Sequence, residues 1–60
     1  MDDGLANVQI QDLSKLWITV SRVVNDLSRI AYELRSVQSR YPTRRVRAVD
    51  NQGRLLDILL

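Results

Sequence analysis

Cysteine and histidine, two residue types that often carry enzyme chemistry, are absent from this 60-residue chain. Their absence excludes disulfides, the usual zinc sites and the common pairs of nucleophile and base. No glycine-rich phosphate loop occurs, and the seven carboxylates are scattered along the chain. We therefore expect a protein that is not an enzyme, with no catalytic residue, no cofactor and no metal.

Long apolar runs are also missing, since none approaches the roughly 20 residues that a membrane-spanning helix needs. The chain starts Met1-Asp2-Asp3, with acidic residues where a signal peptide would carry positive charge. These features predict a cytoplasmic or virion-associated protein without a membrane partner. So short a chain has a small core, yet 45% of its residues are hydrophobic. Association with other copies of the chain would bury the apolar side chains that so small a core cannot hold.

Apolar residues recur at alternating steps of three and four from Leu13 to Tyr41, which is the heptad pattern of a coiled coil. The pattern predicts a mainly α fold: one long amphipathic helix, about 12–40, assembled as a coiled-coil homo-oligomer. Because Leu dominates position a while Val and Ile fill position d, trimers or tetramers are favoured over dimers. A trimer is preferred and a tetramer comes next, because three C-terminal β elements can close around a threefold axis at the helix ends. The predicted interface comprises Leu13, Leu16, Trp17, Val20, Val23, Val24, Leu27, Ile30, Leu34, Val37 and Tyr41.

The N-terminal segment, residues 1–11, allows two conformations. Ala6, Val8 and Ile10 alternate with polar residues, as in a strand. Asp2 and Asp3 could equally cap an extension of the helix. The sequence leaves both open.

Residues beyond Pro42 predict a β-hairpin with strands at about 45–49 and 54–60. Asp50 and Gly53 fit a three-residue turn, with Gly53 in the left-handed conformation. The resulting register sets Arg47 opposite Asp57 and gathers one apolar face. That face comprises Val46, Ala48, Leu56, Ile58 and Leu60. The chain then divides into an N-terminal segment (1–11), a coiled-coil helix (12–41) and a hairpin cap (42–60), all in one domain.

Arginines gather near the start of this hairpin, at Arg40, Arg44, Arg45 and Arg47. In a multimer they could contact phosphates or a partner. The simpler interpretation is that they complete the helix C-terminus and solvate a strand. For Trp17, a place at the seam outweighs a role as a partner-binding anchor.

The leading hypothesis is a structural or adaptor protein that holds itself in a fixed multimer. A second protein could bind the hairpin cap or the surface around Ile18 and Tyr32, which face away from the predicted seam. The plan is similar to the oligomerising ends of fibrous phage and viral proteins, which implies a viral accessory or assembly role. The alternative is a small regulator that binds nucleic acid through the multiplied arginine cluster, although a net charge of +2 disfavours it.

Overall fold

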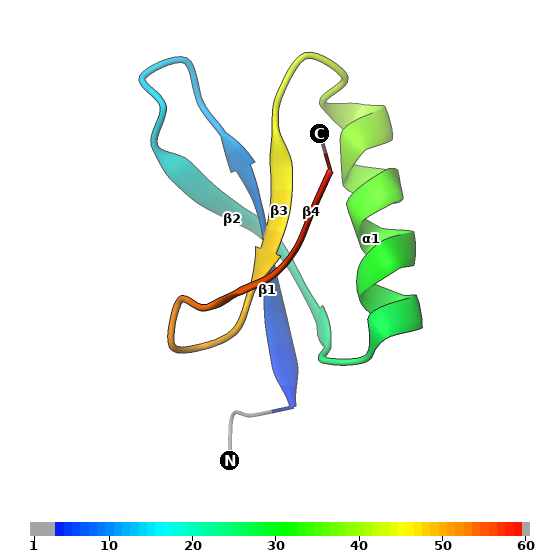
Figure 1. The fold of residues 1–60 in the computed structure, drawn as a ribbon. Coiled ribbons are helices and arrows are strands. Elements are labelled where there is room, and N and C mark those ends of the chain that lie inside the picture. Colours follow the sequence, from blue (N-terminus) through cyan, green and yellow to red (C-terminus); the bar gives the residue numbers. More distant parts are fainter. Residues whose placement is uncertain (1–3, 60) are drawn as a thin grey trace.

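The computed structural model describes residues 4–59, which form a four-stranded antiparallel sheet with one helix against it (Figure 1). The elements follow in the order β1 (Leu5–Gln11), β2 (Trp17–Val24), α1 (Leu27–Arg40), β3 (Val46–Val49) and β4 (Leu55–Leu59). Within the sheet the strands lie in the order β2-β1-β3-β4. Both β2 and β3 are antiparallel to β1, so they run parallel to each other on its two sides. The helix connects these two strands, as in a split β-α-β motif.

The predicted coiled-coil helix over residues 12–40 is wrong, and so is the mainly α fold class. These residues form a hairpin loop, strand β2 and the 14-residue helix α1. Strand β2 is rich in β-branched side chains, which favour a pleated backbone and which a heptad count does not separate from leucine. They are Ile18, Thr19, Val20, Val23 and Val24. No continuous heptad seam remains along which copies could align, so the predicted coiled coil is also wrong.

Helix α1 is capped at its N-terminus by Asp26, whose carboxylate accepts a hydrogen bond from the Arg29 amide at 3.1 Å. This cap satisfies a donor that the first helical turn leaves without a partner. The helix ends at Arg40, and the Tyr41 amide donates to the Val37 carbonyl. Pro42 follows, at a position where it cannot continue the helix.

The core lies between α1 and one face of the sheet. In β1, alternate residues point toward the helix, so the strand alternative for this segment is the observed one, while residues 1–3 lie outside the described part. Ile30, Leu34 and Val37 lie on one side of the helix and are at most 1% exposed. The sheet contributes Ala6, Val8, Ile10, Val46 and Ala48. Part of the apolar repeat is therefore the core-facing stripe of a short helix.

Strands β3 and β4 pair as an antiparallel hairpin, in the predicted register next to the turn but not beyond it. Val49 lies opposite Leu55, and a bulge then places Ala48 opposite Asp57 and Arg47 opposite Ile58. The predicted pair of Arg47 and Asp57 is therefore wrong. The extra residue in the bulge is Leu56, which packs against the core. At the turn, Gly53 has φ of 81°, and its amide donates to the Asp50 carbonyl at 3.0 Å.

Candidate functional site

The helix covers one face of the sheet and leaves the other open. Because side chains alternate along a strand, the neighbours of the core residues point to this second surface, which we call the uncovered face. Two arginines lie on it, and no carboxylate does among the described strand residues. The uncovered face comprises Leu5, Asn7, Gln9, Gln11, Trp17, Thr19, Arg22, Val24, Arg47, Val49, Leu55 and Ile58.

A row of polar side chains crosses the middle of the uncovered face. Arg47 on β3 donates from Nε to Gln9 Oε1 on β1 at 2.8 Å. Gln9 in turn donates from Nε2 to Thr19 Oγ1 on β2 at 3.0 Å. The Arg47 guanidinium also lies over the Trp17 ring, 4.1 Å from the ring centroid. One hydrogen bond to Gln9, itself bonded to Thr19, and one cation–π contact with Trp17 therefore hold the Arg47 guanidinium on this face.

Two loops meet at one end of the sheet, where both lie at the top of Figure 1. One joins β1 to β2 and carries Lys15; the other joins α1 to β3 and carries Arg44 and Arg45. The Gln11 amide donates to the Arg45 carbonyl at 3.0 Å, and Gln11 Nε2 donates to the Lys15 carbonyl at 3.2 Å. We call Lys15, Arg44 and Arg45 the basic end. It adjoins Trp17 and Arg47 on the uncovered face.

Ion pairs among the described residues do not involve the basic end or Arg47. In the described part of the chain, the two ion pairs are Arg40 with Glu33 at 3.6 Å and Arg54 with Asp50 at 2.7 Å. The basic end and Arg47 therefore have no described carboxylate within 4 Å. Positive charge that is not internally paired is free to attract an anion.

The β1–β2 loop is fixed by Asp12, whose carboxylate accepts from the amides of Ser14 and Leu16, both at 2.9 Å. A hydrogen bond from the Ser14 hydroxyl, joined by the one from the Leu16 amide, lowers the pKa of Asp12. Lys15 adopts φ of 70°, a left-handed conformation that costs energy for any residue with a side chain. This rigid loop presents Leu13 and Leu16 to solvent, at 88% and 65% exposure.

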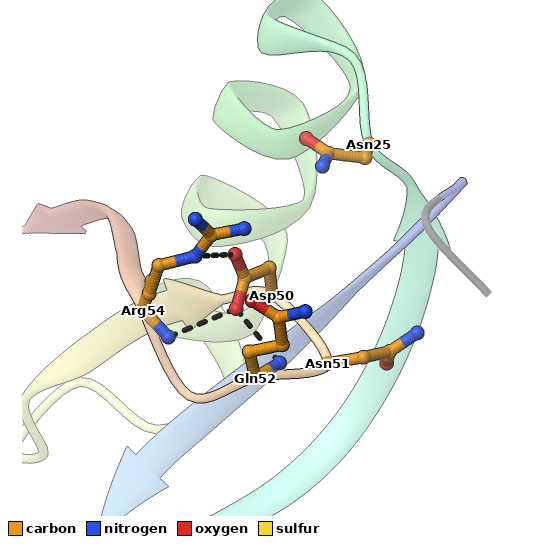
Figure 2. Close-up of a pocket in the computed structure, with 5 residues that line it drawn as sticks. All are labelled: Asn25, Asp50, Asn51, Gln52 and Arg54. Carbon is orange, nitrogen blue, oxygen red and sulfur yellow. Dashed lines mark hydrogen bonds and ion pairs between the residues drawn. The ribbon is translucent and has the colours of Figure 1, made fainter.

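A shallow cavity of about 340 Å³ lies at the other end of the sheet, and Asn25, Asp50, Asn51, Gln52 and Arg54 line it (Figure 2). The Asp50 carboxylate points into the turn rather than toward a ligand. It accepts from the amides of Gln52 and Arg54 and from Arg54 Nε, and these bonds, the Arg54 amide foremost, lower the pKa of Asp50. Because its hydrogen bonds favour the charged form, the Asp50 carboxylate is a poor general acid or base at neutral pH. The cavity is therefore a feature of the hairpin turn.

The structure divides the predicted oligomer interface into three groups. Some of its members are core residues, some are half-buried, and others are exposed on loops, strand β2 or the first helical turn. The core group is Ile30, Leu34 and Val37; the half-buried group is Trp17, Val20, Val23 and Tyr41; the exposed group is Leu13, Leu16, Val24 and Leu27.

The other predicted residues are also dispersed. Val46, Ala48 and Leu56 of the predicted hairpin face lie against the core, Ile58 lies opposite Arg47 on the uncovered face, and Leu60 is outside the described residues. Arg40 is ion-paired, whereas Arg44 and Arg45 lie in the α1–β3 loop and Arg47 lies on the adjoining strand β3. Ile18 and Tyr32 are 45% and 75% exposed, Ile18 on the sheet and Tyr32 on the helix.

Sequence reasoning missed Gln9, Thr19 and Lys15 as members of the site. Gln9 and Thr19 meet because β1 and β2 form a hairpin, which the heptad interpretation concealed. The polar residues that alternate with Ala6, Val8 and Ile10 were the available indication of a polar sheet face.

No cluster of three or more acidic side chains suited to a metal ion occurs within residues 4–59. The helical part of that range also offers no segment with the length and apolarity needed to cross a lipid bilayer. No protein-family model, curated protein or solved structure matches this chain. The chemistry of its own surface is therefore the basis for assigning a function.

Proposed function

We propose that this protein is a small, non-enzymatic nucleic-acid-binding module. The observation that carries the proposal is that, within residues 4–59, an uncovered sheet face free of carboxylates adjoins a basic end without ion pairs. The basic end supplies Lys15, Arg44 and Arg45, and the adjoining sheet supplies Arg47 and Trp17. Phosphate contacts from such cations account for most of the affinity in sequence-independent binding.

The distribution of charge supports this proposal better than the net charge does. The acidic side chains near the helix and the hairpin turn are engaged elsewhere: Glu33 with Ser21 and Arg40, and Asp50 with Arg54. Among residues 4–59, Asp12 is the carboxylate that lies at the basic end; it accepts hydrogen bonds from its own loop and interacts electrostatically with Arg44. The described residues of this end therefore present more cations than carboxylates to an approaching polyanion. The multimer that the sequence invoked to gather these arginines is unnecessary, because the fold itself brings two loops together.

Removing two cations from the basic end is expected to weaken nucleic-acid binding and to reduce its dependence on salt. With four phosphate contacts, from Lys15, Arg44, Arg45 and Arg47, log K should fall with log salt concentration with a slope of about −3. The variant Arg44→Ala with Arg45→Ala should show a slope of about −1.5. Fluorescence anisotropy of a labelled 15-nucleotide strand, measured between 50 and 200 mM salt, gives both values.

The matched control is Arg29→Ala with Arg35→Ala, which removes the same charge from exposed positions on α1. We expect this variant to keep the slope of the unaltered protein. If both double variants lose affinity equally, the binding reflects net charge and the proposed surface is wrong. If the unaltered protein fails to bind at 50 mM salt, the proposed function is wrong.

A second candidate function is an adaptor that binds another protein, and the exposed leucines of the β1–β2 loop favour it. Leu13 and Leu16 project from a loop that Asp12 holds rigid, and such preorganised apolar side chains are suitable anchors for a protein partner. Replacing both by Ser should abolish capture of such a partner while leaving the anisotropy experiment unchanged.

A further inference from the structure

We propose that the nucleic acid bound here is single-stranded and that a base stacks on the pair formed by Trp17 and Arg47. This inference depends on the proposed function and adds the class of ligand and the mode of recognition. It starts from the geometry of the pair, in which the guanidinium carbon lies 4.1 Å from the centroid of the indole ring. The guanidinium lies over one face of the indole, so the pair places a cation and an aromatic ring together on a sheet face that the helix does not cover (Figure 1).

The pair of Trp17 and Arg47 is held rigid before any ligand binds. Arg47 Nε donates to Gln9 Oε1 at 2.8 Å, and Gln9 Nε2 donates to Thr19 Oγ1 at 3.0 Å. These bonds cross three neighbouring strands and restrain the guanidinium plane. An arginine immobilised in the free protein loses little side-chain entropy when a ligand stacks on it. Its Nη groups make no described ion pair, so they can also donate to a phosphate.

The shape of this surface favours a single strand over a duplex. In a duplex the base faces are stacked on one another, and base edges are reached only by an element that enters a groove. Trp17 and Arg47 instead lie on the face of the sheet, where an unpaired base can lie flat. The basic end is next to them, because Trp17 directly follows the loop that carries Lys15. A strand whose bases reach Trp17 therefore has its phosphates beside Lys15, Arg44 and Arg45.

Trp17 is the only tryptophan in the chain, so its fluorescence reports directly on this contact. Titration of the whole protein with a 15-nucleotide oligo(dT) or oligo(U) should quench the emission, whereas a 15-base-pair duplex should quench it much less. The two single strands show whether DNA or RNA is the source of the ligand, because only RNA carries the 2′-hydroxyl. Affinity for the single strands should exceed that for the duplex by about tenfold at equal salt, consistent with the stacking energy of one base.

Two variants separate stacking from charge. Trp17→Leu should weaken single-strand binding about tenfold, whereas Tyr32→Leu, which removes an exposed aromatic ring from α1, should leave it unchanged. Arg47→Lys keeps the charge but loses the flat guanidinium and its bond to Gln9, so it should weaken single-strand binding several-fold. Thermal unfolding of each variant monitors its fold.

The outcomes distinguish this inference from the proposed function. Equal or tighter binding of the duplex, without quenching of Trp17, would overturn the single-strand inference and leave the nucleic-acid function standing. Unchanged single-strand affinity in both Trp17→Leu and Arg47→Lys would also overturn the single-strand inference and leave the nucleic-acid function standing. Absence of binding to all three nucleic acids would overturn the function itself. The fluorescence titration uses the unaltered protein, so it tests the single-strand inference even if a variant fails to fold.

Discussion

Replacing Leu34 by Ala is expected to remove much of the stability of this protein, lowering the free energy of unfolding by about 2–5 kcal/mol. Leu34 is fully buried between α1 and the sheet, so its truncation removes buried methyl groups and leaves a cavity. The total stability of a folded domain is only about 0.05–0.15 kcal/mol per residue, so a chain of this size has little reserve. Urea unfolding followed by circular dichroism measures the change.

The matched control is Leu27→Ala, the same substitution at the first residue of the same helix. Leu27 is 79% exposed at the start of α1, and its truncation should change the free energy of unfolding by about 0.5 kcal/mol or less. A coiled coil would place both leucines in its seam and make both substitutions costly. A Leu27→Ala variant as unstable as Leu34→Ala would therefore contradict the fold described here.

Enlarging Ala48 to Leu is expected to destabilise the protein by about 1–3 kcal/mol through overpacking. Ala48 is fully buried on β3, beside Val8 of β1 and under the helix. A leucine there forces α1 away from the sheet or forces neighbouring side chains out of their preferred rotamers. Thermal unfolding should show a clear fall in the midpoint temperature.

Ala31→Leu provides the comparison for this substitution. Ala31 lies on α1 and is partly exposed, so the added side chain can extend toward solvent. We expect little change in its midpoint temperature. An equal fall in the midpoint temperature of both variants would contradict the claim that tight packing between the helix and the sheet causes the destabilisation by Ala48→Leu.

The sequence predicted the two ends of the fold better than its middle. Alternation at Ala6, Val8 and Ile10 was one of two open alternatives and is the one observed, and Asp50 with Gly53 indicated the turn between β3 and β4. Both signals are local, because alternation and positive φ are properties of a few neighbouring residues. The bulge at Leu56 depends on packing against the core, and no pattern within the hairpin revealed it.

The prediction for residues 12–41 was wrong because the apolar residues of a strand and of a helix happen to continue the same heptad spacing. Val20 and Val23 face the core from a strand, while Ile30 and Leu34 face it from a helix. The break between them is marked by Asn25-Asp26, where Asp26 caps α1. Counting the β-branched residues in Trp17–Val24 favours a strand, but the heptad interpretation did not take that preference into account.

The candidate site could be predicted in composition but not in arrangement. The sequence singled out Arg40, Arg44, Arg45 and Arg47 as a group; Arg40 is ion-paired with Glu33, Arg44 and Arg45 lie in the α1–β3 loop, and Arg47 lies on the adjoining strand β3. It could not place Trp17 over Arg47, because that contact joins residues 30 positions apart through the pairing of β1 with both β2 and β3. Long-range strand pairing is the step at which local patterns carry least information.

A titration of ¹⁵N-labelled protein with a 15-nucleotide single strand, followed by amide chemical shifts, tests the central claim most directly. The largest changes should fall on the uncovered face and the basic end, at Gln9, Lys15, Trp17, Arg45 and Arg47. The exposed side of α1, at Arg29, Tyr32 and Arg35, should change little. Changes concentrated on α1, or an absence of changes at 50 mM salt, would contradict the assignment of the uncovered face and the basic end as the nucleic-acid-binding surface.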